Sequence, residues 1–211
     1  MGCNLGMGNK TGLKAAVISV MKSVFRPKIY FEDESIKDLL FNTPSIIIAN
    51  HTFAFNGAVI GTLLENEDIC FLLAKDMFKG RLLSRFYTEI GCVPIDRQKA
   101  DTAWIHQSRR ILKEGKHICL FPEGKVSRDG ETKAFKPGFL LLAQLTGAPI
   151  VPMYIMGEKN RRLVRQRVIV GSPHSAPKGL SGEEMKACAQ CYRAEVLGLK
   201  EILEEKLKGE G

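Results

Sequence analysis

Residues 45–61 read "SIIIANHTFAFNGAVIG". A short run of apolar, mostly β-branched residues leads into Asn50 and His51, and small apolar residues follow. Such a run is typical of a strand that is buried on both faces of a parallel sheet. We therefore predict a strand over residues 45–49 and a helix of small residues that ends at about Glu65.

The same alternation of strands and helices continues along the chain. Further strands are expected at 28–33, 69–74, 92–95, 117–121, 150–156 and 167–170, and further helices at 11–26, 77–89, 102–114, 139–146 and 181–208. This order predicts a single-domain α/β sandwich with a mostly parallel central sheet flanked by helices. Ser181 and Glu184 form a predicted capping box at the start of the last helix.

Two of the predicted helices carry an apolar side. In the helix at 77–89 this side consists of Leu82, Leu83, Phe86 and Ile90. In the last helix it consists of Met185, Cys188, Tyr192, Val196, Leu199 and Leu203. Most of the six cysteines lie in apolar runs and no secretion signal is evident, so we expect reduced thiols in a cytosolic protein. Cys188 and Cys191 are interpreted as buried helix-face residues rather than as a zinc or redox site.

The N-terminal segment is predicted to be a short amphipathic helix. Its apolar face consists of Leu13, Val17, Val20, Met21 and Val24. Such a helix either packs on the domain or lies flat on an anionic membrane, and both remain open. We divide the chain into residues 1–27, with possible membrane contact, and a domain over residues 28–211. No apolar window approaches the ~18 residues that a membrane-spanning helix needs, so any membrane contact is expected to be interfacial.

The chain is basic, with 31 Lys and Arg against 23 Asp and Glu and a formal charge of +8. This excess favours an anionic partner, which could be nucleic acid, a phosphorylated small molecule or an acidic membrane face. The densest basic run, "KNRRLVRQR" at 159–167, contains no aromatic residue. We therefore predict no nucleic-acid partner.

Polar groups follow several of the predicted strands. His51 lies just after the strand at 45–49, and similar segments are "GCVPIDR" (91–97), "FPEGKVSRDG" (121–130) with "FKPG" (135–138), and "APIVPMY" (148–154). Ligands of open parallel sheets bind at the carboxyl ends of the strands, so these segments are expected to form one site.

These blocks, in this order and spacing, resemble the glycerophospholipid acyltransferase family, of the lysophosphatidate (1-acylglycerol-3-phosphate) acyltransferase type. The family motif N-H-x-x-x-x-D is similar to residues 50–56, which end in Asn56 instead of Asp. G-x-x-F-I-D-R is similar to residues 91–97, with Pro94 at the aromatic position. F-P-E-G-T-R-S is similar to residues 121–127, with Lys125 and Val126 in place of Thr and Arg, and "LLAKDMF" (72–78) resembles the A-K-x-E-L segment.

The resemblance implies transfer of a fatty acyl group from acyl-CoA or acyl-carrier protein to the free hydroxyl of a lysophospholipid. The default acceptor is 1-acyl-sn-glycerol-3-phosphate, which would give phosphatidic acid at the cytoplasmic side of the membrane, with the protein bound peripherally. His51 would be the general base and Asn56 its partner. The residues expected to bind substrate are Lys75, Arg97, Glu123, Gly124, Lys125, Ser127, Arg128 and Lys136. Arg97 offers a planar fork for the phosphate, and Glu123 contacts the glycerol phosphate or shapes the pocket.

The residue types suit this chemistry. A neutral histidine, with an ordinary pKa of about 6.5, can take the hydroxyl proton near neutral pH. The thiolate of a thioester leaves without a dedicated acid, so neither a Ser or Cys nucleophile nor a metal or cofactor is expected beyond the acyl thioester. The sequence has no G-x-S-x-G motif and no metal-ligand cluster.

Asn56 is the main departure from the family. Its carbonyl oxygen can accept the imidazole N–H bond, but it cannot offset the charge of an imidazolium, and its NH2 group could select the wrong tautomer. Five residues along a helix correspond to ~500°, so His51 must lie in the loop before the helix if the two side chains meet. A slower enzyme, a non-catalytic lipid- or CoA-binding relative, and a thioesterase or phospholipase therefore remain alternatives.

Overall fold

The computed structural model describes residues 12–40, 42–64, 68–89, 91–96, 102–127, 129–156 and 166–210. The strands are β1 (Lys28–Phe31), β2 (Ile46–Ala49), β3 (Ile69–Ala74), β4 (Cys92–Ile95), β5 (His117–Leu120), β6 (Ile150–Met156) and β7 (Arg167–Val170). The helices are α1 (Gly12–Phe25), α2 (Ile36–Leu39), α3 (Asn56–Leu63), the 3-10 helix η1 (Lys75–Phe78), α4 (Arg81–Glu89), α5 (Ala103–Lys113), α6 (Gly138–Thr146) and α7 (Gly182–Lys208).

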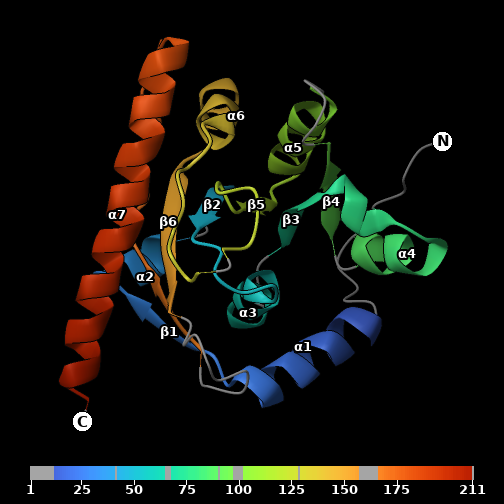
Figure 1. The fold of residues 1–211 in the computed structure, drawn as a ribbon, viewed down its shortest axis with the longest axis horizontal. Coiled ribbons are helices and arrows are strands. Elements are labelled where there is room, and N and C mark those ends of the chain that lie inside the picture. The colour runs from blue at the N-terminus through green and yellow to red at the C-terminus, as the bar shows by residue number, and fades with distance from the viewer. Residues whose placement is uncertain are drawn as a thin grey trace.

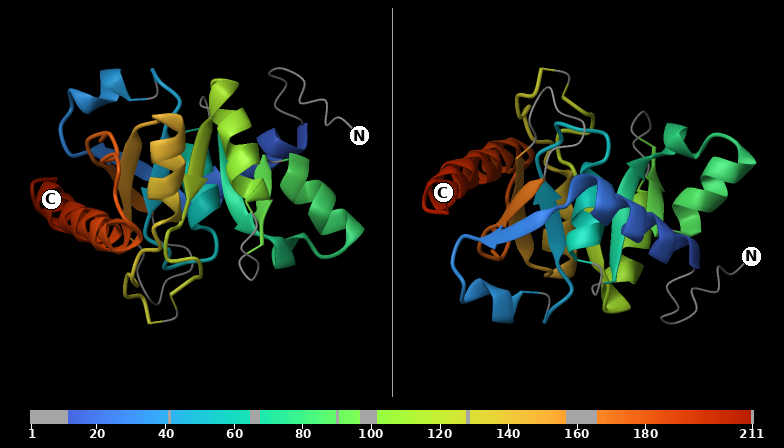
Figure 2. Two further views of the ribbon diagram at one scale, coloured as in Figure 1. Left: turned by 90° about the horizontal axis from the view of Figure 1, so that it is seen from above. Right: turned by 90° about the horizontal axis from the view of Figure 1, so that it is seen from below.

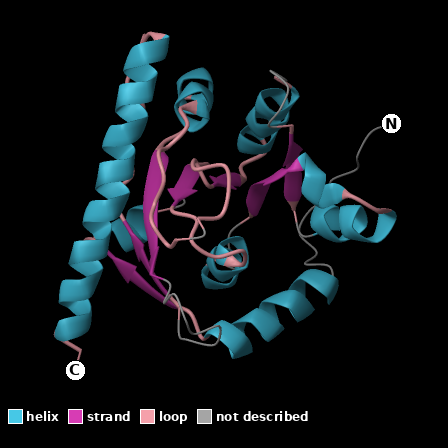
Figure 3. Ribbon diagram, viewed as in Figure 1, coloured by secondary structure: helices cyan, strands magenta, loops and turns pink. Residues whose placement is uncertain are grey.

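The strands form one sheet in the order β1-β7-β6-β2-β5-β3-β4. The five strands from β6 to β4 are mutually parallel. β7 is antiparallel to β6, and β1 runs parallel to β7. Helices lie on both faces of the sheet (Figures 1 and 3). The predicted α/β fold with a mostly parallel central sheet is confirmed.

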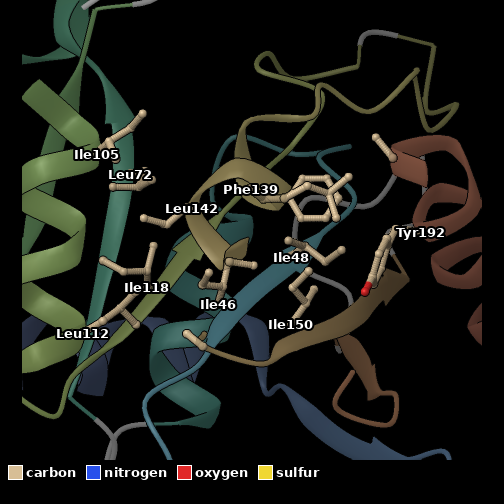
Figure 4. Close-up of a cluster of buried hydrophobic side chains, with 14 of the residues drawn as sticks. Ile46, Ile48, Leu72, Ile105, Leu112, Ile118, Phe139, Leu142, Ile150 and Tyr192 are labelled. Atoms are coloured by element: carbon tan, nitrogen blue, oxygen red, sulfur yellow. The ribbon is translucent and has the colours of Figure 1, made fainter. Parts of the chain in front are cut away.

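β2 lies inside the sheet and is covered on both faces, which explains its uninterrupted apolar sequence. Ile46 and Ile48 belong to the cluster formed with α5, α6 and α7, where they meet Phe139 and other large side chains (Figure 4). Ile47 and Ala49 belong to the opposite cluster, formed with α1, α2 and α3. All four side chains are fully buried, so the apolar run at 46–49 holds the two layers of helices on one sheet.

The segment after β3 differs from the prediction of one helix over 77–89. Instead η1 follows β3 directly, and α4 begins only after Gly80, whose φ of +85° belongs to the left-handed region. Leu82 is 85% exposed, so its predicted role in an apolar packing face is wrong. α4 lies at the edge of the molecule beyond β4, and none of the described helices or strands covers its outer side (Figure 1). The Leu83 side chain and Ile90 lie outside the described residues.

The C-terminal helix α7 begins at the predicted capping box. Ser181 N donates to Glu184 Oε2 at 2.7 Å, and Glu184 N donates to Ser181 Oγ at 3.4 Å. The C-terminal part of the predicted apolar side of this helix is buried: Tyr192, Val196, Leu199 and Leu203. Met185 and Cys188 are only half-buried. Cys191 is exposed, so its interpretation as a buried helix-face residue is wrong, because it lies on the solvent side of α7.

The helix predicted at 11–26 is present as α1, which packs against α3 (Figure 1). Its last residue, Phe25, is buried, whereas Val20 and Val24 are 56% and 37% exposed. No helix in the described ranges is long and apolar enough to span a bilayer. The division of the chain at residue 27 stays a prediction, as does membrane contact by α1.

Candidate active site

The polar segments meet at one edge of the sheet. Because β2, β5, β3 and β4 are parallel, their carboxyl ends lie along the same edge. His51 follows β2, and the turn at 121–127 follows β5, the strand paired with β2. Both views in Figure 2 show the loop after β5 extending past the end of the sheet on the same side as the segment after β2.

Asn50 anchors the beginning of the loop that contains His51. β2 ends at Ala49, which is opposite Met153 of β6. The buried Asn50 side chain then donates from Nδ2 to Ile155 O at 3.0 Å and accepts from Ile155 N at 2.7 Å. The amide therefore extends the pairing with β6 after the main chain of β2 has turned away. This structural role was not predicted from the sequence.

His51 is held by its main chain and by its ring. Its N–H donates to Glu123 Oε1 at 2.6 Å, and its carbonyl oxygen accepts from Ser127 N at 2.7 Å. The imidazole stacks on Phe121, with centroids 4.1 Å apart and an interplanar angle of 14°. Phe121 was predicted as the end of a strand, and this contact was not predicted from the sequence. The signal that could have predicted the stacking is an aromatic residue directly after the strand that neighbours β2.

Asn56 meets the imidazole from the first turn of α3. Its Oδ1 lies 3.3 Å from His51 Nδ1 and accepts a hydrogen bond from Phe53 N at 2.7 Å. A main-chain N–H can only donate, so the carbonyl oxygen rather than the NH2 group must face Phe53. The same oxygen faces the ring, which requires the proton on Nδ1 and leaves Nε2 with a free lone pair. Asn56 is fully buried and His51 lies in the loop before the helix, as the spacing required.

This arrangement leaves a donor unsatisfied. Asn56 Nδ2 is buried and has no hydrogen-bond partner among the described residues. An unmade hydrogen bond of this kind costs about 1–3 kcal/mol. Burial also lowers the pKa of His51, and the smaller effect of the Asn56 hydrogen bond raises it. The pKa of the ring therefore lies below its ordinary value, and the imidazole is neutral at pH 7.

Glu123 connects the loop after β2 to the loop after β5. It is 4% exposed, and its second oxygen accepts from Lys133 N at 2.9 Å. Burial raises the pKa of Glu123, while the hydrogen bonds from Lys133 N and His51 N oppose that shift. Both carboxylate oxygens thus bind main-chain N–H groups. Of the two roles expected for Glu123, this geometry favours shaping the pocket over direct contact with glycerol phosphate.

Ser127 and the segment after it are tied together locally. The hydroxyl of the buried Ser127 donates to Asp129 Oδ1 at 2.6 Å, and Lys133 forms an ion pair with Asp129. These bonds and the nearby ammonium hold the pKa of Asp129 well below its usual range, with Lys133 as the largest cause. The hydroxyl of Ser127 is therefore directed to the loop itself.

Two predicted cations lie at the Glu-Gly turn. Gly124 has a φ of +75°, and Lys136 Nζ lies 3.1 Å from the position that a Cβ would take there. Lys125 is exposed. No carboxylate among the described residues pairs with the Lys125 or Lys136 side chain, so both ammonium groups are available to an anion.

Lys75 lies further along the same edge. It follows β3, which is two strands and about 10 Å from β2. Its side chain is 68% exposed, and its Nζ is 3.8 Å from Asp96 Oδ2. Arg97 and Arg128 lie outside the described residues, as does most of the basic run at 159–167. Within the described ranges, no three His, Cys, Asp or Glu side chains are grouped so as to hold a metal ion.

The substitution Glu123→Gln tests the connection between the two loops. It turns one acceptor oxygen into an NH2 group facing a main-chain N–H. We expect the free energy of unfolding to fall by about 1–3 kcal/mol, with faster hydrogen exchange at the amides of His51 or Lys133. The matched variant Glu131→Gln changes an exposed carboxylate of the same loop and should leave both unchanged. Equal stability of the two variants would contradict the assignment.

Comparisons with known proteins show which family the chain belongs to. The family model described as Acyltransferase matches residues 27–156, more than half of the chain. The chain is 25% identical over 132 residues to the 1-acyl-sn-glycerol-3-phosphate acyltransferase of Bacillus subtilis, covering 61% of this chain and 65% of that protein. It is 38% identical over 116 residues to the enzyme of the same name from Limnanthes douglasii, covering 54% and 41% of the two chains.

The chain thus spans less than two thirds of the length of these relatives. The crystal structure of the 1-acyl-sn-glycerophosphate acyltransferase PlsC from Thermotoga maritima has the same fold. It superposes with a TM-score of 0.65 at 20% sequence identity and covers 93% of this chain and 84% of that one. With the model match over residues 27–156, the chain belongs to the Acyltransferase family.

Proposed function

We propose that this protein transfers a fatty acyl group from acyl-CoA or acyl-carrier protein to 1-acyl-sn-glycerol-3-phosphate, giving phosphatidic acid. The observation that supports this proposal most is the contact between Asn56 Oδ1 and His51 Nδ1, since it leaves Nε2 free to act as a base. The family match and the printed names of the relatives support the reaction class and the acceptor.

The proposed reaction proceeds by direct transfer. His51 Nε2 takes the proton of the acceptor hydroxyl as its oxygen attacks the thioester carbonyl. The tetrahedral intermediate then collapses and expels the thiolate, which receives the proton from the imidazolium. No bond forms between the acyl group and the protein, and we propose no metal or cofactor beyond the thioester co-substrate.

The amide at position 56 supports this base without a charge. Asn56 holds Nδ1–H through its carbonyl dipole, but it offsets little of the positive charge that develops on the imidazole. Burial of the ring also disfavours the charged form, which agrees with the lowered pKa of His51. We therefore propose an active enzyme whose transition state is less stabilised than it would be with a carboxylate.

The acceptor phosphate is proposed to bind at the turn after β5. Gly124 allows the main chain to approach the ligand, and Lys125 and Lys136, which pair with no carboxylate among the described residues, supply positive charge beside it. Arg97 and Arg128 are proposed to add guanidinium contacts, and Lys75 to contribute from its position further along the edge. Glu123 and Ser127 hold the turn in shape through their bonds to the main chain and to Asp129.

The surface beside the His51 loop is proposed to contact an anionic membrane. Val20 and Val24 of α1 are exposed, and so is Phe55, at 47%. The Phe55 ring lies 6.0 Å from that of Phe25, so the end of α1 contacts the loop that carries the base. We propose peripheral binding at the cytoplasmic side of the membrane, where the lysophospholipid would enter.

Product analysis with purified protein tests the reaction. With acyl-CoA and 1-acyl-sn-glycerol-3-phosphate, we expect free thiol and phosphatidic acid in equal amounts, and loss of both by at least 10²-fold in His51→Ala. His106→Ala, which removes an exposed histidine of α5, should keep full activity. Free fatty acid without phosphatidic acid would identify a hydrolase, and no thiol release would identify a binding protein.

The variant Asn56→Asp tests the role of the amide through pH. A carboxylate raises the pKa of His51, so the acid limb of kcat/KM should move to higher pH by about one unit. Transfer at pH 8, where the ring is neutral in both proteins, should be equal or faster. Gln107→Glu, a matched change on α5, should leave the profile unmoved. A clear loss at pH 8 would mean that the amide itself is required.

Vesicle binding tests the membrane surface. Val20→Asp should weaken co-sedimentation with vesicles containing phosphatidylglycerol by about tenfold, because it places a charge among the exposed apolar groups of α1. Ser19→Asp adds the same charge about 100° around the helix and should weaken binding much less. Equal binding of both variants and the parent protein would exclude this surface.

A further inference from the structure

We propose that the main-chain amide of Phe53, supported by the Phe25 ring from the end of α1, selects the histidine tautomer that acts as the base. Both are positioning groups, and neither touches the reacting atoms. The inference rests on the proposed function for its activity readout. It explains how an amide can stand where the related motif has a carboxylate.

The orientation of Asn56 depends on a reciprocal pair of bonds. Phe53 N donates to Asn56 Oδ1 at 2.7 Å, and Asn56 N donates back to Phe53 O at 3.0 Å. A half-turn of the amide would point Nδ2 at the N–H of Phe53, so that two donors would face each other. It would also move Oδ1 to the place of Nδ2, which has no hydrogen-bond partner among the described residues. Only the observed orientation satisfies Phe53.

The tautomer of His51 follows from that orientation. With Oδ1 fixed toward the ring, Nδ1 must carry the proton for a hydrogen bond to form at 3.3 Å. Without the Phe53 amide, Asn56 could present NH2 to the ring, which would place the proton on Nε2 and remove the base. A carboxylate has two equivalent acceptor oxygens, so it would not need this selection.

Aromatic packing holds the Phe53 amide in place. The Phe25 ring meets the Phe53 ring edge-on, with centroids 5.8 Å apart and an interplanar angle of 77°. Phe25 is 4% exposed, and its carbonyl oxygen accepts from Gln166 N at 3.0 Å. Phe55 packs on both rings, at 6.0 Å from Phe25 and 5.3 Å from Phe53. The end of α1 is thereby connected to the hydrogen bond that orients Asn56.

The direct test replaces one N–H group by oxygen. Incorporating phenyllactic acid at position 53 converts the amide to an ester, keeps the side chain and removes only the donor. In the parent protein, ¹⁵N spectra should show His51 protonated on Nδ1. In the ester protein the spectra should show a substantial Nε2–H population, and acyl transfer should fall at least tenfold. An ester at Ser35, whose N–H donates to Asp33 Oδ1 at 2.8 Å in an exposed turn, is the matched control and should change neither.

Rescue by a carboxylate distinguishes positioning from a general loss of structure. In the Asn56→Asp background, the ester at position 53 should reduce acyl transfer less than threefold. Phe25→Ala should lower transfer in the parent protein by about threefold to tenfold, and Asn56→Asp should largely restore it.

The outcomes separate this inference from the proposed function. An Nε2–H tautomer in the parent protein, an unchanged tautomer in the ester protein, or an ester effect of equal size in both backgrounds overturns the inference even if transfer persists. The predicted change of tautomer in a protein without any transfer would support the inference and refute the proposed function.

Discussion

The main chain of His51 is bound on both sides by the turn that follows β5, and the site depends on this attachment. Glu123 accepts the N–H of His51, and Ser127 donates to its carbonyl oxygen. The attachment is possible because β2 and β5 are adjacent parallel strands, whose carboxyl ends release their loops at the same edge. The sheet places the two loops side by side, and a buried carboxylate joins them.

Asn56 stands where the resembled motif has Asp, and its Oδ1 lies 3.3 Å from His51 Nδ1. A buried carboxylate beside the ring would stabilise an imidazolium but would itself be costly to bury in the resting state. Asn56 avoids that buried charge, and its Nδ2 has no hydrogen-bond partner in the part of the chain that the structure describes. A carboxylate presents an acceptor oxygen to the ring whichever way it is turned, because its two oxygens are equivalent. The Asn56 side chain must be oriented, and the Phe53 amide orients it. The Phe25 contact then links the base to α1, the helix whose exposed apolar groups we propose to meet the membrane.

Much of this could be predicted from the sequence, and the failures have physical reasons. The strands and long helices follow from the pattern of apolar residues, and the convergence of His51, Asn56 and Glu123 follows from strand ends in a parallel sheet. The four-residue helix α2 and the break at Gly80 were missed because short elements carry little periodic signal. Leu82 and Cys191 were misplaced because periodicity assigns residues to a helix face without showing what covers it.

The groups of the site that were not predicted are mainly those whose role cannot be inferred from the type of the residue. Almost every residue of any chain has a main-chain N–H group. Only the fold shows that the N–H of Phe53 binds Asn56 and that the N–H of Ser127 binds His51. Phe121 was assigned to a strand because its apolar ring continued the run before it. Asn50 was noticed only as part of a motif, and its pairing with Ile155 needed the strand order.

We infer that the His51 imidazole is neutral at physiological pH and able to accept a proton, with an amide rather than a carboxylate at its Nδ1. An NMR titration that follows the ring proton resonances of His51, identified by their absence in His51→Ala, measures this directly. We expect a midpoint below 6.5, since burial lowers the pKa of the ring. A midpoint above 7 would show an imidazole that is mostly charged at pH 7, and His51 could then not act as the proposed base.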